Sequence, residues 1–178
     1  DVTPSPALSQ VGEEYDVDGR IVGIVVDATS DPEVVQWLVT ALAAEKLVPL
    51  LLAPHGGPIW EGRAEVAHRT LLTGRSTEFD AAVIVSVPEP GPDSLQSLDA
   101  KAGAVAVPAV DARVSLLVDE LYRHAKPIGV VGDADLAVSV GLTDSVPGVH
   151  IGDAESVVAD LLSSMRRHRG WERFATAS

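Results

Sequence analysis

Two apolar runs joined by an amphipathic segment limit the fold of this chain more than any other feature. Residues 21–26 read IVGIVV and residues 48–53 read VPLLLA. Neither run shows the alternation of apolar and polar residues that is typical of a strand with one solvent-exposed face. The segment between them repeats apolar residues at helical spacing. Strand, helix and strand in this order form a parallel pair with a right-handed crossover. We therefore expect a parallel sheet covered by helices.

The start of the first helix has clear signals. Ser30 or Asp31 can cap it, Pro32 suits its first turn, and Glu33 would complete a capping box with Ser30. The face expected to turn inward consists of Val34, Val35, Leu38, Val39, Leu42 and Ala43.

The rest of the chain repeats this alternation. Further strands are expected at 81–87, at 127–131 and, as a short last one, at 149–151. Residues 54–60 read as a loop, and residues 64–72 as a short hairpin or edge excursion. Residues 93–102 are a short helix candidate, and Pro108 leaves residues 103–110 ambiguous.

Two strongly amphipathic helices complete the pattern. One spans 111–125, and the terminal helix begins at residue 153, ends in a basic run at 166–169 and leaves Trp171 to dock in a groove. The expected inward residues are Val110, Val114, Leu117, Val118, Leu121, Tyr122 and Ala125 in the first and Val157, Val158, Leu161, Leu162 and Met165 in the second. The prediction is α/β: a three-layer, doubly wound, flavodoxin-like sandwich with a mostly parallel sheet of about five main strands. Residues 1–18 form an arm, 19–174 the domain and 175–178 a tail.

Composition excludes several classes of function. The 178 residues carry a formal net charge of −13, which disfavours nucleic acid and anionic membranes as partners. There is no cysteine, so thiol catalysis, disulfides and thiolate metal sites are excluded. No apolar run approaches the roughly 20 residues of a membrane span, and the acidic, Pro/Ser-rich start is no signal peptide. We expect a cytoplasmic protein.

The turn after the strand at 127–131 is where this fold class displays a nucleophile. Gly132 occupies that position, followed by Asp133 and Asp135. Asp27 and Glu33 follow the first strand at the same edge. Such carboxylates can form an acid/base pair, but the stronger interpretation is that they cap helices. The sequence predicts no catalytic residue.

Neither metals nor oxyanions have a strong candidate site. The histidines, His55, His68, His124, His150 and His168, show no ligand spacing, so no metal site is expected. The HGG stretch at 55–57 resembles an oxyanion-hole loop, but no G-x-S-x-G accompanies it, and a flexible loop is the preferred interpretation.

Five stretches in order resemble one family. These are SPALS at 5–9, GRIVGIVVDA at 19–28, AHRTLLTGRSTEFDAAVIV at 67–85, ELYRHAKPIGVVGDA at 120–134 and RHRGWER at 167–173. Together they resemble the C-terminal domain of large-subunit haem catalases. That domain is a flavodoxin-like module of the class I glutamine amidotransferase-like superfamily, which includes the PfpI-type proteases. Ala125 stands where the family usually has cysteine.

The resemblance implies a non-catalytic domain. The PfpI-type Cys-His pair aligns with Gly132 and Asp133, a vestigial elbow, and Glu33 matches a vestigial acid. The haem, and the oxidative-stress chemistry that turns hydrogen peroxide into water and oxygen, would lie in the parent core. Neither Tyr15 nor Tyr122 has the context of a haem ligand, so this chain is expected to bind no cofactor.

The expected partners are the catalase core of the same polypeptide, the parent homotetramer and unfolded clients of a holdase chaperone activity. Two alternatives stay open. One is a stand-alone PfpI-type hydrolase or lyase that uses Asp133 or Asp135. The other is a small-ligand module with its ligand near Asp27, Gly132 and residues 88–92.

Overall fold

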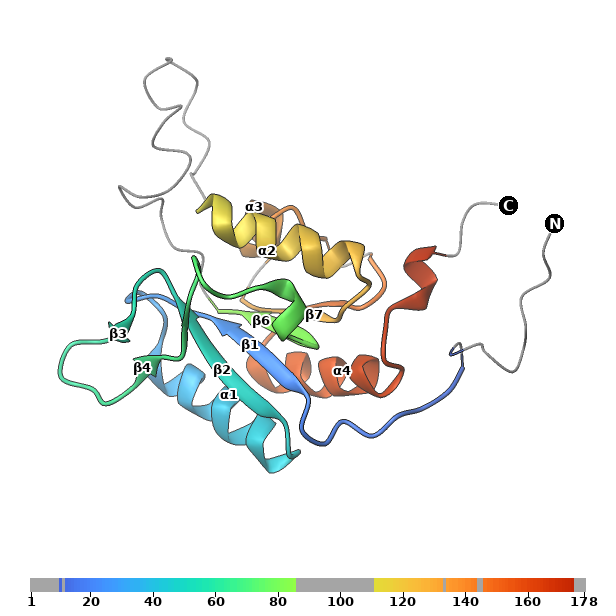
Figure 1. The fold of residues 1–178 in the computed structure, drawn as a ribbon, viewed down its shortest axis with the longest axis horizontal. Helices are drawn as coiled ribbons and strands as arrows, with labels where there is room; N and C mark the ends of the chain where they lie inside the picture. The colour runs from blue at the N-terminus through green and yellow to red at the C-terminus, as the bar shows by residue number, and fades with distance from the viewer. Residues whose placement is uncertain (1–9, 11, 86–110, 133, 144–145, 175–178) are drawn as a thin grey trace, which may run out of the picture.

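A six-stranded parallel sheet forms the centre of the computed structural model, which describes residues 10, 12–85, 111–132, 134–143 and 146–174 (Figure 1). The strand order is β5-β2-β1-β6-β7-β8, and every neighbouring pair is parallel. The strands are β1 (Ile21–Val25), β2 (Val48–Ala53), β5 (Arg69–Thr70), β6 (Ala81–Ile84), β7 (Ile128–Val131) and β8 (Val149–Gly152). Without β5 this is the flavodoxin order, which confirms the predicted fold class.

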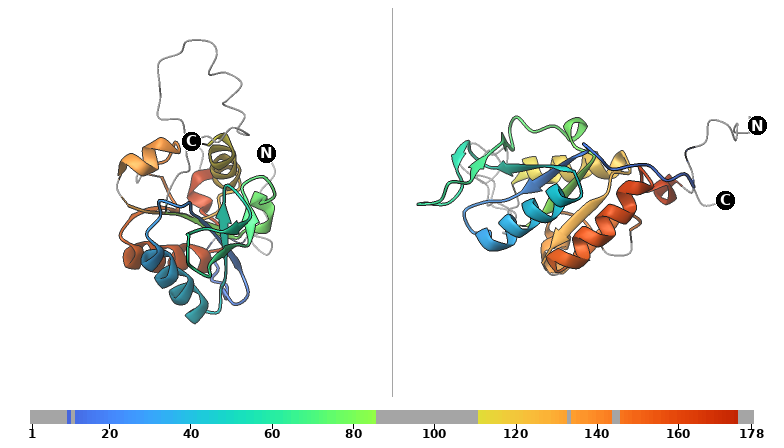
Figure 2. Two further views of the ribbon diagram at one scale, coloured as in Figure 1. Left: turned by 90° about the vertical axis from the view of Figure 1, so that its left-hand side faces the viewer. Right: turned by 90° about the horizontal axis from the view of Figure 1, so that it is seen from below.

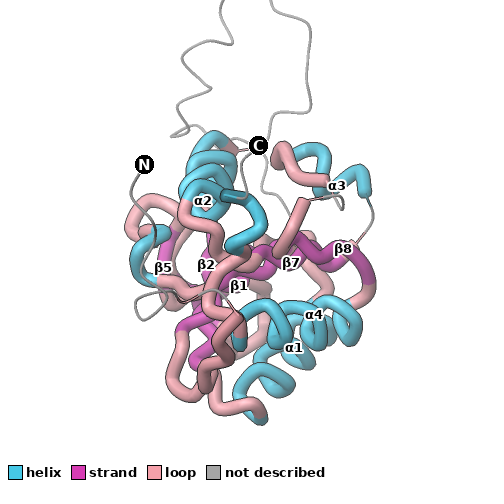
Figure 3. The backbone as a smooth tube through the Cα atoms, turned by 90° about the vertical axis from the view of Figure 1, so that its right-hand side faces the viewer, coloured by secondary structure: helices cyan, strands magenta, loops and turns pink. Residues whose placement is uncertain are grey.

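Helices cover both faces of the sheet. Helices α1 (Pro32–Ala44) and α4 (Ala154–Arg166) lie on one face, and α2 (Ala112–Arg123) and α3 (Ala134–Ser139) lie on the other (Figures 1 and 3). Alternate residues of β1 and β6 enter the two resulting cores: Ile24 and Val83 pack with α1 and α4, whereas Val25 and Ile84 pack with α2. Strands buried on both faces explain the continuous apolar runs.

The N-cap residue of the first helix is one of the two predicted, but the predicted capping box is not formed. Asp31 is its N-cap and accepts a hydrogen bond from the Glu33 backbone N–H at 2.9 Å, with Pro32 at the first helical position. The predicted capping box between Ser30 and Glu33 is wrong. Ser30 precedes the cap, and its hydroxyl accepts a hydrogen bond from the Asp27 N–H at 3.0 Å instead.

The hairpin foreseen within residues 64–72 instead pairs residues 66–67 with 57–58, which lie in the segment predicted to be a loop, whereas the edge excursion is present. Strands β3 (Gly57–Pro58) and β4 (Val66–Ala67) pair antiparallel, and β5 then joins β2 at the sheet edge (Figure 2). The expectation of about five main strands missed β5, because a two-residue strand shows no periodicity. Two 3₁₀ turns, η2 (Ser76–Glu78) and η5 (Trp171–Phe174), complete the described elements.

Most of the predicted helix faces are correct. All five inward residues of α4 are buried, and so are the central residues of α2. Two predictions fail: Ala43 is exposed on α1, and Tyr122 is 40% exposed at the end of α2, where the helix reaches the rim of the sheet. The predictions for 1–9, 86–87, 88–92, 93–102, 103–110 and 175–178 lie outside the described residues. No helix in the described ranges is long and apolar enough to cross a membrane.

Candidate functional site

The topology brings the candidate residues to one rim of the sheet, which we call the carboxyl edge because the parallel strands end there. Asp27 follows β1, His55 follows β2 and Gly132 follows β7. In open α/β sheets ligands bind in the crevice at this edge, at the point where the strand order reverses. Here that point lies between β1 and β6.

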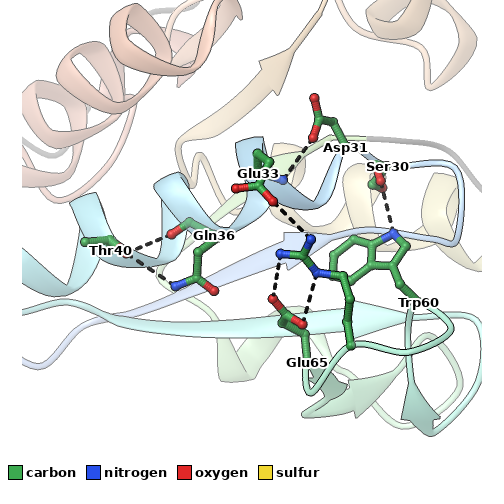
Figure 4. A network of polar contacts seen from close by, with 8 residues as sticks. Ser30, Asp31, Glu33, Gln36, Thr40, Trp60 and Glu65 are labelled. Carbon is green, nitrogen blue, oxygen red and sulfur yellow. Dashed lines mark hydrogen bonds and ion pairs between the residues drawn. The ribbon is translucent and has the colours of Figure 1, made fainter.

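The aspartates after β1 accept hydrogen bonds from groups of their own turn. One carboxylate oxygen of Asp27 accepts hydrogen bonds from the Thr29 N–H at 2.8 Å and the Thr29 hydroxyl at 2.6 Å. The Trp60 indole N–H closes the turn by donating to the Ser30 carbonyl at 3.0 Å (Figure 4). Asp31 caps α1. These contacts match the capping interpretation of the carboxylates.

Glu33, the predicted vestigial acid, lies on the surface in an ion-paired chain. Its side chain is 78% exposed and accepts a hydrogen bond from Arg63 at 3.0 Å, while Arg63 also pairs with Glu65 at 3.3 Å (Figure 4). The hydrogen bonds to Glu65 and Glu33 raise the pKa of Arg63. The pKa of Glu65 is lowered, first by its own backbone N–H and then by Arg63. A solvated, paired carboxylate of this kind lacks the buried setting of a general acid.

The strand-to-helix turn after β7 contains no nucleophile at its tip. Gly132 has φ +146°, a conformation that favours glycine, and its N–H donates to the Gly152 carbonyl at 2.9 Å. A Cβ here would approach Leu136 Cδ2 at 3.4 Å. Asp135 lies in the exposed first turn of α3, and Asp133 lies outside the described residues. The turn has the position of an elbow without its reactive atom.

A buried carboxylate on α2 was missed in the sequence. Asp111 is fully buried, caps α2 through the Arg113 N–H at 2.9 Å, and pairs with the Arg113 guanidinium at 2.5 Å. Burial raises the pKa of Asp111, but the hydrogen bonds from Arg113 outweigh burial, and the net pKa is lowered. His55 in the HGG loop is exposed and adds a small favourable charge. An aspartate directly before an amphipathic helix was the available signal.

Most of the histidines have structural partners. His68 Nδ1 accepts a hydrogen bond from the Leu51 N–H at 3.0 Å, and His150 Nε2 lies 2.8 Å from the Ser164 hydroxyl. The His168 ring lies between Tyr15, at 5.7 Å, and Trp171, at 6.5 Å between centroids. Within the described ranges no group of three or more His, Cys, Asp or Glu side chains could hold a metal ion.

The described tyrosines do not fit a haem site. Tyr122 is partly exposed, with the Arg173 guanidinium 4.8 Å above its ring, and Tyr15 lies on the arm before β1. Two cavities of about 190 and 230 Å³ lie elsewhere, one between residues 71–75 and α2 and one beside α1. Both are smaller than the roughly 300 Å³ at which ligand pockets begin, and neither is lined by a tyrosine.

Several buried polar contacts between distant segments lie at the opposite rim, the amino edge, where the strands begin. Lys126 is 7% exposed and donates to the Ser76 and Phe79 carbonyls, both at 2.6 Å. The buried Ser76 hydroxyl donates to Glu120 at 2.6 Å. Asp80 accepts a hydrogen bond from the Ile21 N–H at 3.0 Å. The bonds of Lys126 and Ser76 fasten the TGRSTEFDA stretch to the ELYRHAK stretch, and the bond of Asp80 fastens the first stretch to β1. Both motifs therefore have a structural role.

Comparison with known proteins covers nearly the whole chain. A family model described as the C-terminal domain found in long catalases matches residues 18–175. Catalase HPII of Pseudomonas aeruginosa is 33% identical over 177 residues, which are 97% of this chain and 23% of that catalase. Catalase C of Rhizobium meliloti is 28% identical over 180 residues, with the same two shares. The chain thus spans about a quarter of the length of these curated relatives.

Proposed function

This chain belongs to the family of C-terminal domains found in long catalases, and on that premise we propose that it is a non-catalytic domain of a haem catalase. The match over residues 18–175 is the observation that carries the proposal. The parent reaction converts two molecules of hydrogen peroxide into two of water and one of oxygen. Its haem would be held in the catalase core of the same polypeptide, because the described tyrosines here offer no haem site.

We also propose that Gly132, Asp133 and Glu33 are remnants of a catalytic site. The glycine at the tip of the β7–α3 turn and the solvated Glu33–Arg63 pair support this reading. The corresponding boundaries are an arm at 1–18, the domain at 19–174 and a tail at 175–178. Peptide hydrolysis by the purified protein that disappears in Asp135→Ala would contradict a non-catalytic domain.

The proposed role is to stabilise the parent homotetramer in the cytoplasm. An appended domain that buries surface against the folded enzyme stabilises the folded state, because it binds that state and not the unfolded chain. The covalent link gives the domain a high effective concentration at the enzyme. The domain also has a groove of about 190 Å³ between residues 71–75 and α2, where Leu72 is 66% and Leu116 is 52% exposed.

Removal of the domain from the full-length catalase tests this role. A variant that ends at residue 18 should keep its haem and its initial peroxide turnover per haem. It should lose activity faster on heating and dissociate more readily in native mass measurements. Equal inactivation half-lives and equal tetramer content in the two proteins would refute the stabilising role.

The same groove favours a second role as a holdase. Exposed leucines beside Arg75 and Glu120 form an apolar surface with a charged rim, which suits transient contact with unfolded clients. Full-length catalase should then suppress aggregation of a heat-denatured client, and Leu72→Ser with Leu116→Ser should weaken suppression without changing peroxide turnover. Suppression that survives both substitutions would contradict this assignment of the surface.

A further inference from the structure

A short segment that follows α4 is held at the amino edge by contacts with distant loops. This segment, residues 167–174, which we call the strap, leaves α4 and ends in the turn η5 (Figure 1). The Gly170 N–H donates to the Ala125 carbonyl, in the loop between α2 and β7, at 2.7 Å. A Cβ at residue 170 would lie 3.3 Å from the Pro147 carbonyl oxygen, in the loop before β8. Because a single 3₁₀ turn is not stable by itself, such contacts hold the strap in place.

Arg173 anchors the strap to the same two loops. Its guanidinium donates to the Pro147 carbonyl at 2.6 Å and to the Tyr122 carbonyl at 3.1 Å. Gly148 has φ +74°, and a Cβ there would lie 3.0 Å from Arg173 Nη2, so the loop leaves just enough room for the guanidinium. An arginine stays charged over the whole pH range in which proteins fold. The strap therefore carries a fixed positive charge into a partly buried place.

His150 of β8 lies among the charges of the strap. Its Nε2 is 2.8 Å from the hydroxyl of Ser164, which is 1% exposed and accepts a hydrogen bond from Arg167 Nη2 at 3.2 Å. The hydroxyl can donate its own hydrogen to Nε2 while the imidazole is neutral. A proton on Nε2 would replace this acceptor by a donor and add a positive charge. The charges that face His150 are Arg167 and Arg173 of the strap and Asp160 of α4.

His168 is the second histidine of this region and belongs to the strap itself. Its ring lies between those of Tyr15, at 5.7 Å, and Trp171, at 6.5 Å between centroids. Three cations and one acid face it: Arg169, Arg20, Lys126 and Asp80. Burial is the first cause that lowers the pKa of both histidines, and the facing cations lower it further. Both rings therefore lie in surroundings that oppose a positive charge.

We propose that the strap is an acid-sensitive fastening, which is closed while His150 and His168 are neutral and detaches from the loops when both are protonated. Detachment returns the two rings to water and separates them from the arginines. The closed strap binds fewer protons than the open one, so a fall in pH through 6.5 favours the open form.

The release is expected to be local. The other histidines, His55, His68 and His124, are exposed, so the protonation of their rings meets no comparable burial. Ordinary carboxyl pKa values lie near 4, and carboxylates therefore stay ionised at pH 5.5. We expect the sheet and both cores to stay folded while the strap opens. This inference concerns the domain's own residues and does not depend on a catalase core.

Hydrogen–deuterium exchange of the purified protein at pH 7.0 and pH 5.5 tests the proposal. The readout is the protection of the strap amides, corrected for the pH dependence of intrinsic exchange. With a pKa of 6.5 in the open form, each histidine lowers this protection by at most about eightfold over the interval, and both together by at most about seventyfold. We expect a fall of more than about tenfold in the strap and of less than about twofold in α1. Unchanged protection of the strap would overturn the inference, and so would an equal fall in α1, which indicates global unfolding.

Substitution of the two histidines tests the cause of the release. Gln at position 150 keeps an amide that can bond to Ser164, and Asn at position 168 tolerates the φ of +70° found there. The fall in strap protection should shrink to less than about twofold in the double variant His150→Gln, His168→Asn. Each single variant should show a fall of at most about eightfold, which decides the question even if the double variant loosens the strap at pH 7.0.

His124→Gln is the matched control, because His124 is exposed and lies at the end of α2 beside the strap's contacts. This variant should lose strap protection as the wild type does. A fall of wild-type size in the double variant, or a fall above about eightfold in either single variant, would contradict a release driven by His150 and His168.

Discussion

The two edges of the sheet use their polar groups in opposite ways. At the carboxyl edge, Asp27 and Asp31 bond to their own turn, and Glu33 pairs with Arg63 in solvent. At the amino edge, Lys126 is buried and Arg173 is half-buried, and both join segments far apart in sequence. The edge where this fold class holds ligands has contacts within its turns and a solvated ion pair, whereas the other edge has buried contacts between distant segments.

This difference shows that architecture does not locate function by itself. The β7–α3 turn keeps the position of a nucleophile elbow, yet Gly132 has no side chain to react. Substitutions at the two edges should therefore differ in how much they change stability. Four substitutions measure this difference.

The largest expected loss of stability comes from Lys126→Met at the amino edge. The variant keeps the buried stem but removes the donor to two carbonyls, so that buried acceptors lose a charged partner. We expect the free energy of unfolding to fall by about 3 kcal/mol, measured by urea denaturation. Lys46→Met is the control: its side chain is 73% exposed and pairs with Asp18, so its substitution should leave the free energy of unfolding nearly unchanged. Similar losses in the two variants would remove the distinction between buried and exposed cations.

Asp111→Ala should cost about 2 kcal/mol at neutral pH, because it removes an N-cap and leaves Arg113 without its carboxylate. Asp153→Ala removes the exposed cap of α4 and should lower stability by less than Asp111→Ala does. The pKa of folded Asp111 lies below 3.8, so its contribution is complete above that value and is lost as the pH falls through the folded pKa. Equal losses would mean that the buried pair adds nothing to the cap.

His150→Gln should change how stability depends on pH more than it changes stability at neutral pH. Burial lowers the pKa of His150 below 6.5, and the facing charges are Asp160, Arg167 and Arg173. Between the folded pKa and 6.5 the unfolded chain binds more protons, so wild-type stability falls on acidification, by at most about 1.4 kcal/mol per pH unit from this group.

Thermal unfolding from pH 7 to pH 5 should therefore have a shallower slope in His150→Gln. His168, whose pKa burial also lowers, keeps part of the slope in both proteins. Substitution of the exposed His124 by Gln is the control and should leave the slope unchanged. An identical slope in the His150 variant and the wild type would contradict a buried, neutral histidine.

The smallest effect is expected for Glu33→Gln at the carboxyl edge. Its ion pair with Arg63 is solvated, and exposed pairs contribute about 0.5 kcal/mol or less. Denaturant unfolding should place the variant within that range of the wild type. A loss above about 1.5 kcal/mol would show that the stability of the carboxyl edge depends on this acid.

The candidate site could be predicted from the sequence only in part. Gly132 and the capping acids were readable because each acts within its own turn. Asp111 and Lys126 were not singled out, because their burial depends on the tertiary structure. The two carbonyls that Lys126 binds also lie 47 and 50 residues away in the sequence. Tyr122 was placed in the core by helical spacing, but the helix end reaches the rim and leaves it 40% exposed.

The sequence by itself determined the elements, the parallel sheet and the absence of thiol chemistry, because periodicity, caps and composition are properties of neighbouring residues. The tertiary structure alone decided that β5 adds a sixth strand, that Glu33 pairs with Arg63 rather than Ser30, and that buried cations gather at the amino edge. Those outcomes depend on which distant segments meet and how much water they exclude. Neither the contacts between distant segments nor the burial that they produce is encoded in the spacing of residues along one segment.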